Sequence, residues 1–339
     1  MSPVVLTASG WTSNMAEATP LHIVLLGAQG QLGHALEQAL PVLGSVVACA
    51  RAQADLSQAP ALQALLDRHQ PQLIVNAAAY TAVDKAEQEP DLAQAINAQA
   101  PAVLAQWAAA HGAVLVHYST DYVFDGRSPR PYNEADAPAP LSVYGQSKWA
   151  GERAVLAAAG RHLVFRTSWV VGAHGGNFLK TMLRLGTERD SLRVVADQHG
   201  APTSTDLIAH TTVQVLQQMR APALAVNTKG EGGQPPNAPW VPADDPRWGL
   251  YHLAAAGETT WHAYACHVMS RATAFGWPMR ASAQRIEAIA TDQYPLPAPR
   301  PANSRLNTQR LQSRFGLSLP DWQAGVDAVI DSLPIPHRP

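Results

Sequence analysis

Short apolar runs alternate with longer amphipathic segments through the first half of the chain. Five apolar runs have the length and composition of buried strands, at residues 22–26, 45–50, 71–79, 113–119 and 162–170. The segments between them carry apolar residues at helical spacing, at residues 31–40, 58–69, 83–88, 91–110 and 142–159. Because strands that alternate with such helices form βαβ units, we predict an α/β fold with a Rossmann-like, doubly wound parallel sheet.

The regular alternation ends near residue 170, which predicts a second and smaller lobe. We expect the first domain over 21–170, with segments near 203–225 and 249–257 returning to it. The C-terminal lobe then comprises 171–202 and 258–330.

Two further segments stand apart from this pattern. Residues 1–20 have neither a basic start nor a long apolar stretch, so we expect a flexible extension and not a signal peptide. Residues 228–248 are rich in Gly, Pro and Asp, a composition that predicts a surface insertion.

Composition narrows the possible functions. The 339 residues include 24 Lys+Arg and 26 Asp+Glu, a net charge of −2, which argues against nucleic acid as a partner. No apolar run reaches the roughly 18 residues of a membrane span, so we expect no membrane partner. Two cysteines cannot build a disulfide framework, which fits a cytoplasmic protein. The 13 histidines show no spacing typical of metal ligands, so we expect no metal site.

A glycine-rich turn follows the first predicted strand and opens the first predicted helix. Gly27, Gly30 and Gly33 are spaced GxxGxxG, with Gln31 and Leu32 between the last two. Gly27 permits a tight turn, Gly30 lets the backbone approach a pyrophosphate, and Gly33 lets the helix pack on the strand. The helix N-terminus then offers N–H groups to the phosphates. An ordinary βα turn is the alternative, but the strand before and the helix after favour a dinucleotide site.

The residues after the second strand bear on the choice of cofactor. An acidic residue there would bind a ribose 2′-hydroxyl, whereas a basic residue accommodates a 2′-phosphate. The chain has Arg51 at this place, which favours NADPH, with NADH as the alternative. A solvated loop arginine is the other interpretation. Asp55 and Leu56 resemble the acidic and apolar pair that lies beside an adenine in related folds.

Candidate catalytic residues follow the fourth strand. Tyr144 and Lys148 stand at i and i+4, so they share one helix face. An ammonium near a phenol favours the phenolate, so we expect Lys148 to lower the pKa of Tyr144 and prepare it for proton transfer. Thr120 ends the strand at the edge where parallel sheets bind ligands. A solvated Tyr and Lys beside a Ser/Thr turn is the alternative, but the three features in this order favour an enzyme.

This set resembles the extended short-chain dehydrogenase/reductase superfamily. Further stretches resemble one family within it, that of the dTDP-4-dehydrorhamnose reductases: VNAAAYTAVDKAE (75–87), HYSTDYVFDG (117–126), PLSVYGQSKWAGE (140–152), FRTSWVVG (165–172), NFLKTMLRL (177–185), DQHGAPTSTDLIA (197–209), GLYHLAAAGETTWHAYA (249–265) and RPANSRLNT (300–308). The resemblance spans about 21–330, apart from the 228–248 insertion. It implies that the first domain binds NAD(P) and that the C-terminal lobe binds the substrate.

The resemblance implies an NAD(P)H-dependent oxidoreductase. It would transfer a hydride to C4 of dTDP-4-dehydro-6-deoxy-L-mannose (dTDP-4-dehydrorhamnose) and give dTDP-L-rhamnose, the last step of that biosynthesis, which supplies polysaccharide synthesis. Tyr144 would protonate the developing alkoxide. Lys148 would tune Tyr144 and bind the nicotinamide ribose, and Thr120 would hydrogen-bond the sugar near C4.

The resemblance also places the two ligands. The cofactor is expected against Gly27, Gly30, Gln31, Leu32, Gly33, Arg51, Asp55, Leu56, Ala78, Ala79, Tyr80, Thr81, Tyr118, Tyr144 and Lys148. The dTDP-sugar is expected against Thr120, Asp121, Trp169, Asn177, Phe178 and, through its diphosphate, Arg300. Trp169 as a core tryptophan and Arg300 as a plain loop residue remain the alternatives.

One departure concerns a metal. Some members hold magnesium through acidic residues at a dimer contact, one of them in the first helix. Ala35 stands at that position, with Glu37 as the nearby acid. We therefore do not expect bound magnesium, and we expect a monomer or a weak homodimer.

Two other functions compete. A sugar-nucleotide 4,6-dehydratase needs an acidic pair after the strand-four threonine, but Thr120 is followed by Asp121 and then Tyr122. A 4-epimerase is harder to exclude by chemistry, although the downstream stretches fit it poorly. The regulatory subunit of methionine adenosyltransferase shares this fold and acts mainly as a partner protein. The intact set of Thr120, Tyr144 and Lys148 favours an enzyme over a binding subunit.

Overall fold

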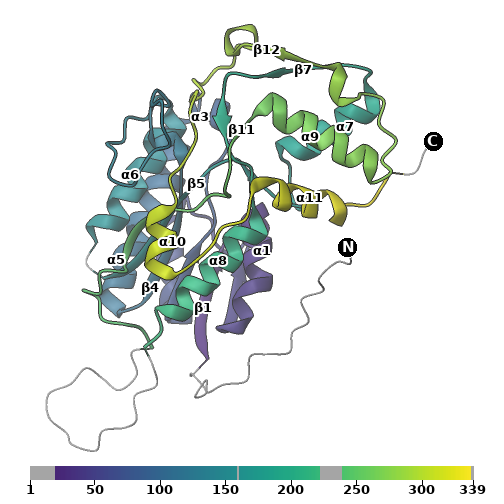
Figure 1. The fold of residues 1–339 in the computed structure, drawn as a ribbon. Coiled ribbons are helices and arrows are strands. Elements are labelled where there is room, and N and C mark those ends of the chain that lie inside the picture. Colours follow the sequence, from purple (N-terminus) through teal and green to yellow (C-terminus); the bar gives the residue numbers. More distant parts are fainter. Residues whose placement is uncertain (1–19, 159, 222–238, 337–339) are drawn as a thin grey trace, which may run out of the picture.

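A computed structural model describes residues 20–158, 160–221 and 239–336. The chain forms a larger lobe around one central sheet and a smaller lobe beside it (Figure 1). No helix in the described ranges is long and apolar enough to cross a membrane. The expected extension over 1–20 lies outside the described residues except for its last residue.

The central sheet confirms the predicted α/β fold. Its six strands run in the order β10-β5-β4-β3-β1-β2, and every pair is parallel. Their bounds are β1 Leu21–Leu26, β2 Gly44–Cys49, β3 Leu73–Asn76, β4 Val114–Thr120, β5 Arg161–Thr167 and β10 Gly249–His252. β3 and β4 are buried along their whole length, which explains why they are apolar runs, while the edge strand β2 alternates in exposure.

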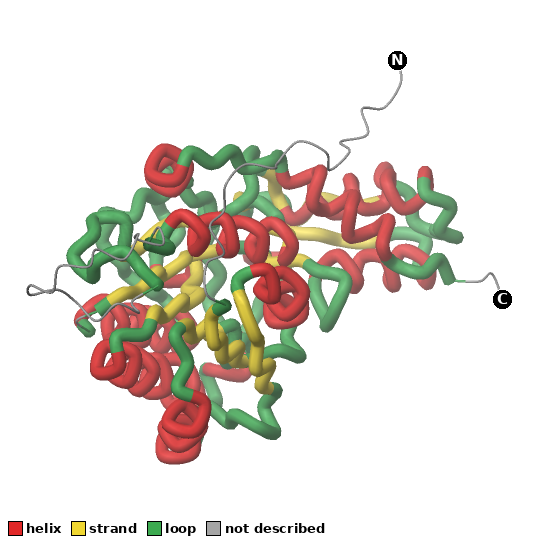
Figure 2. Tube along the Cα trace, turned by 90° about the horizontal axis from the view of Figure 1, so that it is seen from below, coloured by secondary structure: helices red, strands yellow, loops and turns green. Residues whose placement is uncertain are grey.

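Helices cover both faces of this sheet (Figure 2). One face packs against α1 (Gln31–Ala39), α8 (Thr205–Gln218) and α10 (Gln309–Phe315). The other packs against α2 (Ala59–His69), α5 (Ala100–His111) and α6 (Val143–Ala157). Shorter segments precede α5: α3 (Val83–Ala86), α4 (Pro90–Gln94) and η2 (Ala95–Gln99), which is one turn of π-helix.

The order of the strands places a ligand site. From β1 the chain crosses to β2 on one side and then to β3 on the other, so the direction of winding reverses between β1 and β3. Ligands of open parallel sheets bind beyond the strand ends at such a reversal. The late strand β10 pairs with β5, so a segment far along the chain completes the sheet.

The smaller lobe has its own apolar core. It is built from α7 (Phe178–Glu188), α9 (Trp261–Ala274) and α11 (Trp322–Ser332), beside β7 (Leu192–Val195) paired with β12 (Ile286–Ile289). Two short pairs lie near the junction of the lobes, β6 (Val170–Val171) with β9 (Thr203–Ser204) and β8 (His199–Gly200) with β11 (Thr259–Thr260).

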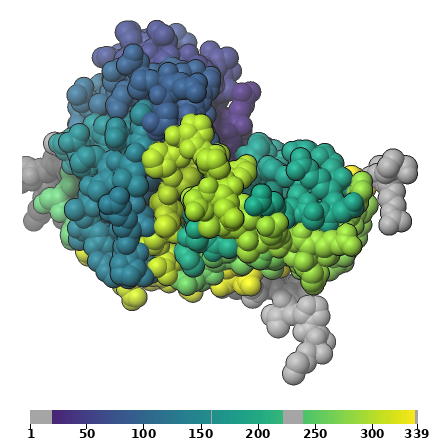
Figure 3. Space-filling model, turned by 90° about the horizontal axis from the view of Figure 1, so that it is seen from above, coloured from purple at the N-terminus to yellow at the C-terminus, as the bar shows by residue number. Residues whose placement is uncertain are grey.

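A segment near the C-terminus runs between the two lobes, shown yellow-green between blue and teal in Figure 3. Asn303 donates its backbone N–H to Gly126 of the larger lobe at 3.0 Å. The next residue, Ser304, donates to His199 of the smaller lobe at 2.7 Å. This segment therefore connects the lobes through its backbone.

The predicted surface insertion at 228–248 needs correction where it is described. Trp240 and Trp248 are buried against the core of the larger lobe, and the Trp240 indole donates to the Gln72 carbonyl at 3.2 Å. The Gly, Pro and Asp content pointed to a loop, but two large apolar side chains anchor its end to the core. The rest of the insertion, up to residue 238, lies outside the described residues.

Candidate active site

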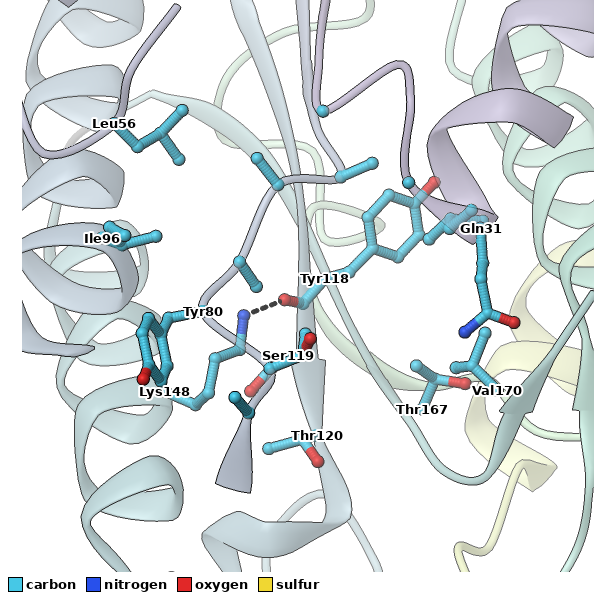
Figure 4. Close-up of a pocket in the computed structure, with 18 of the residues that line it drawn as sticks. Gln31, Leu56, Tyr80, Ile96, Tyr118, Ser119, Thr120, Lys148, Thr167 and Val170 are labelled. Carbon is cyan, nitrogen blue, oxygen red and sulfur yellow. Dashed lines mark hydrogen bonds between the residues drawn. The ribbon is translucent and has the colours of Figure 1, made fainter. Parts of the chain in front are cut away.

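A cavity of about 710 Å³ lies where the strands β1, β3, β4 and β5 end, and Figure 4 shows many of its residues. It brings together most of the residues singled out from the sequence: Gly27, Gly30, Gln31, Leu32, Arg51, Asp55, Leu56, Ala78, Ala79, Tyr80, Thr81, Tyr118, Thr120, Asp121, Tyr144, Lys148 and Trp169. Four others lie outside its lining, namely Gly33, Asn177, Phe178 and Arg300. Most of the residues singled out from the sequence therefore line one connected space.

The glycine turn has the geometry that a pyrophosphate needs. Gly27 has φ +81°, and a Cβ there would lie 2.7 Å from the Ala78 backbone nitrogen. A Cβ on Gly33 would lie 1.9 Å from the Gly27 carbonyl oxygen, so only glycine lets α1 begin this close to β1. Gly30 precedes α1 without a side-chain cap, which leaves the first N–H groups of the helix open to an anion.

The adenosine end of the cavity holds an exposed cation. The Arg51 side chain is 74% exposed, and its Nε lies 3.8 Å from a carboxylate oxygen of Asp55. Asp55 accepts hydrogen bonds from the backbone and hydroxyl of Ser57 at 2.9 and 2.8 Å, which lower its pKa. Leu56 is buried beside it. The guanidinium is thus mostly exposed beside Asp55, which also bonds within its own loop.

Asn97 is a residue that the sequence analysis missed. It is buried in the π-helical turn η2, and its amide binds both backbone groups of Tyr80, at 2.9 and 3.0 Å. The same amide donates to the Ser147 hydroxyl of α6 at 3.0 Å. Asn97 therefore ties the loop after β3 to the helix that carries Tyr144. The signal available in the sequence, an asparagine within an apolar helix, was too weak to single it out.

The three candidate catalytic residues meet at the end of β4. Tyr144 and Lys148 are buried on one face of α6, which Ser142 caps by accepting from the Gly145 N–H at 3.1 Å. The Lys148 Nζ donates to the Tyr118 carbonyl oxygen at 2.6 Å, as the dashed line in Figure 4 shows. Thr120, the last residue of β4, lines the same cavity as Tyr144. The shared helix face and the nearby threonine are therefore as the spacing indicates.

The expected effect of Lys148 on Tyr144 needs correction. Burial raises the pKa of Tyr144 to about 12, and the hydrogen bond with Thr120 only partly opposes this. Burial lowers the pKa of Lys148 to about 8. The sequence revealed the shared face but not its burial, and the ammonium binds a backbone carbonyl instead of the phenol. Tyr144 is consequently protonated at neutral pH, the state that a proton donor requires.

Asp121 adds a buried carboxyl group next to Thr120. Burial raises the pKa of Asp121 to about 6, while hydrogen bonds with Ser304 and Thr120 partly oppose the shift. The Thr120 hydroxyl donates to it at 3.0 Å. Asp121 thus adds a buried carboxyl group to the lining of the cavity.

Trp169 lines the cavity in an unusual conformation. Its φ is +48°, in the left-handed region, and its ring stacks on Trp261 with centroids 3.6 Å apart. A Cβ on Gly200 would lie 2.5 Å from the Trp169 ring. Trp261, which the sequence analysis did not single out, donates through Nε1 to Gln198 at 3.1 Å. The stack explains how a bulky residue is held in a conformation that side chains rarely adopt.

Asn177 and Phe178 lie outside the cavity lining and contact residues beside it. Asn177 accepts from the Lys180 N–H at 3.0 Å and so caps α7. Its amide donates to Gln31 of the glycine turn at 2.8 Å. Phe178 packs on Trp261, with ring centroids 4.6 Å apart. Both residues therefore contact groups that line or border the site.

Arg300 has a protein partner. Its guanidinium donates to the Asp84 carboxylate at 2.7 Å, and the Ala298 N–H donates to the same carboxylate at 3.1 Å. The side chain is only 16% exposed. The structure thus shows a lobe-bridging ion pair where the sequence left a phosphate contact or a plain loop arginine open.

Metal ligands do not gather in the described part of the chain. Within it, no three or more His, Cys, Asp or Glu side chains are arranged to hold an ion.

Comparison with known proteins agrees with this arrangement. A family model described as the RmlD substrate binding domain matches residues 21–229 and 238–335. The dTDP-4-dehydrorhamnose reductase of Escherichia coli K12 is 44% identical over 321 residues, which cover 92% of this chain and 98% of that protein. The enzyme of the same name from Burkholderia thailandensis is 42% identical, with 92% and 99% covered.

Solved structures are similar over the same extent. The dTDP-4-dehydrorhamnose reductase of Bacillus anthracis in complex with NADP has a TM-score of 0.79 and 31% identity, covering 92% of this chain and 99% of that one. The dTDP-4-dehydrorhamnose reductase of Clostridium acetobutylicum has a TM-score of 0.78 and 32% identity, with 91% and 98% covered.

The geometry and the comparisons lead to the same assignment. The glycine turn, the open helix end and the buried tyrosine and lysine suit a nicotinamide dinucleotide, and a similar structure holds NADP. The chain is an NAD(P)H-dependent oxidoreductase, and it belongs to the dTDP-4-dehydrorhamnose reductase family.

Proposed function

We propose that this protein reduces dTDP-4-dehydro-6-deoxy-L-mannose (dTDP-4-dehydrorhamnose) to dTDP-L-rhamnose, the last step of dTDP-L-rhamnose biosynthesis, in the cytoplasm. The observation that carries the proposal is that Thr120, Tyr144 and Lys148 line one cavity, where the Lys148 ammonium is held by the Tyr118 carbonyl oxygen. When bound, NADPH supplies the hydride that goes to C4 of the sugar. The NADP-bound relative and the exposed Arg51 support NADPH over NADH.

The residues of this chain would then do the following. The cradle of Gly27, Gly30 and Gly33 holds the pyrophosphate, since the missing side chains of Gly27 and Gly33 let the turn pack against Ala78 and let α1 begin close to β1. Lys148 holds the nicotinamide ribose. Tyr144 gives its hydroxyl proton to the oxygen at C4.

The sugar carbonyl needs orientation as well as a proton. The Thr120 hydroxyl, which donates to Asp121 in this structure, would turn to donate to the C4 oxygen, and Asp121 would then accept from the sugar hydroxyls. Trp169 packs on the substrate from the smaller lobe side, fixed by its stack on Trp261. These contacts would place C4 within reach of the hydride.

A coupled assay tests this function. The keto-sugar is generated in place, this protein is added, and the absorbance of NADPH and of NADH is followed separately. We expect oxidation that depends on the keto-sugar and is faster with NADPH. Silence with both cofactors, in protein shown to bind NADPH, would contradict the proposed reaction and favour a different sugar nucleotide or a binding subunit.

A further inference from the structure

Helix α6 carries a third buried ionisable side chain on its catalytic face. Tyr144, Lys148 and Glu152 stand at i, i+4 and i+8, so they lie one above another along the helix. All three are buried, and Glu152 is only 1% exposed. Burying a carboxylate without partners costs free energy. The groups that surround Glu152 therefore need to be identified.

Glu152 is held rigidly by an arginine of the neighbouring strand. Arg166 of β5 donates to both of its carboxylate oxygens, through Nε at 2.9 Å and through Nη2. The guanidinium also lies over the Phe124 ring, 4.8 Å from its centroid. Arg166 directly precedes Thr167, which lines the cavity. The ion pair therefore links α6, the helix that carries Tyr144 and Lys148, to β5, the strand that pairs with β4.

The charge of Glu152 acts on Lys148. Burial alone disfavours an ammonium, and it lowers the pKa of Lys148 to about 8; the negative charge of Glu152 opposes this shift. His117 of β4 faces the same lysine but is neutral, because burial holds its pKa well below the usual value. Asp121 of η3 (Asp121–Val123), whose pKa burial raises to about 6, is hydrogen-bonded to Thr120.

Among the described residues, the other ionisable side chains packed on α6 are engaged away from this lysine or exposed, and Glu87 accepts from the Val143 N–H at the start of the helix. The segment η2 contains no ionisable residue. In α3, α4 and α5 the ionisable side chains are engaged elsewhere or exposed: Asp84 with Arg300, Lys85 with Glu89, His111 stacked on Trp107, and Asp91 exposed to solvent. Glu152 is thus the carboxylate in position to keep the lysine charged.

We propose that Glu152, clamped by Arg166, is a positioning residue that keeps Lys148 protonated and aimed at the cofactor. This inference rests on the proposed function, in which Lys148 holds the nicotinamide ribose and supports Tyr144. Glu152 touches neither ligand; it acts through Lys148. The Arg166 clamp sets the direction of the carboxylate and prevents it from collapsing onto the lysine as a closed pair.

The test is the pH dependence of NADPH binding, followed by the fluorescence of the dinucleotide in the full-length protein. A lysine must be protonated to donate, so binding is present below its pKa and is lost as the pH rises through it. In the wild type we expect this loss near pH 8. In Glu152→Gln we expect the loss about one pH unit lower, which makes binding about fivefold weaker at pH 8 and nearly unchanged at pH 6.

Glu152→Asp keeps the charge and should return the profile toward that of the wild type. Glu188→Gln is the matched control, because it removes the same charge from an exposed ion pair with Arg184 on α7 and should leave the profile in place. A purely structural role for Glu152 would instead weaken binding equally at every pH or only lower the melting temperature, and either result would overturn the proposal.

Arg166→Gln provides a test of opposite sign. It frees Glu152 from its counter-charge, so the loss of binding should move to higher pH. General damage to the core would instead shift the profiles of Arg166→Gln and Glu152→Gln in the same direction.

If Glu152→Gln does not fold, the comparison is made between Glu152→Asp, Arg166→Gln and the wild type. Wild-type affinity that is already lost below pH 7 would overturn the proposal. Failure of keto-sugar turnover in a wild type with the expected binding profile would contradict the reaction and not this role.

Discussion

Asn177 of the smaller lobe donates a hydrogen bond of 2.8 Å to the Gln31 side chain, in the glycine turn of the larger lobe. The same amide group donates to the Gly172 carbonyl at 2.8 Å, while its oxygen caps α7. One side chain thus caps a helix of the smaller lobe and contacts the glycine turn of the larger lobe. The position of the smaller lobe is thereby tied to the cofactor turn.

Replacing Asn177 with serine separates these two duties. Serine keeps an N-cap oxygen for α7 but cannot reach Gln31. Losing a hydrogen bond worth about 1 kcal/mol should lower kcat/KM for NADPH roughly fivefold, with little change in melting temperature. Steady-state kinetics and thermal melting measure both. In a double-mutant cycle with Gln31→Met, additive losses would show that the two residues are not coupled.

Tyr144→Phe should bind NADPH like the wild type and lose turnover. The ring keeps its packing, but the proton that goes to the C4 oxygen is gone, and general acids contribute about 100-fold to 10,000-fold. Tyr251→Phe is a suitable control, because it removes a buried hydroxyl bonded to the Arg247 carbonyl, away from the cavity. A Tyr144→Phe enzyme that retained most of its rate would exclude Tyr144 as the acid.

The fold and the outline of the site were predictable because their causes are local. The apolar runs became β1, β3, β4 and β5, and the spacing of Gly27, Gly30 and Gly33 matches a turn where two of the three leave no room for a Cβ. Tyr144 and Lys148 also lie on the same face of α6, because helix geometry alone places residues i and i+4 together.

What could not be predicted depends on contacts between distant segments. The π-helical Asn97 binds Tyr80 and Ser147, which lie 17 and 50 residues away. The stack of Trp169 on Trp261 joins the end of β5 to α9. The pKa of Tyr144 is governed by burial, a property of the packed molecule, and therefore the sign expected from Lys148 alone was wrong.

Arg51→Asp should shift the preference from NADPH toward NADH. The exposed guanidinium can pair with a 2′-phosphate, whereas a carboxylate repels that group and accepts from a 2′-hydroxyl. A charged hydrogen bond is worth about 1.5–3 kcal/mol, so the ratio of kcat/KM values should change by about 10-fold to 100-fold. Arg68→Asp makes the same change on the exposed face of α2 and should leave the ratio alone. An unchanged ratio in Arg51→Asp would mean that Arg51 does not contact the 2′-phosphate.

Asp121→Asn should stabilise the protein without ligands while it impairs turnover. The pKa of this carboxyl is raised to about 6 by burial, so the folded state favours its neutral form. The wild-type protein is therefore most stable, with respect to this carboxyl group, below the unfolded pKa near 4. That stability falls as the pH rises toward 6, because a charge must then be buried. The gain in the free energy of unfolding should be about 3 kcal/mol at pH 8 and vanish near pH 4.

Asp125→Asn tests the opposite sign in the same loop. Hydrogen bonds from Tyr132, at 2.6 Å, and from the Arg127 N–H lower the pKa of Asp125, so its ionised form stabilises the fold. This variant should lose stability at pH 8, and the loss should shrink as the pH falls below 4. Thermal melting of both variants across this range checks the pair; two shifts of the same sign would contradict burial as the cause at Asp121.

Gly33→Ala should abolish or severely weaken NADPH binding. The added methyl would lie 1.9 Å from the Gly27 carbonyl oxygen, so α1 must move away from β1 and the cradle must open. Such overpacking typically costs about 1–3 kcal/mol of stability, and the displaced N–H groups lose their aim at the pyrophosphate. Gly176→Ala, at the rim of the same cavity, introduces a methyl with no atom within 4 Å and should bind NADPH normally. Titration calorimetry distinguishes the two, and equal affinities would show that α1 can shift without disturbing the pyrophosphate site.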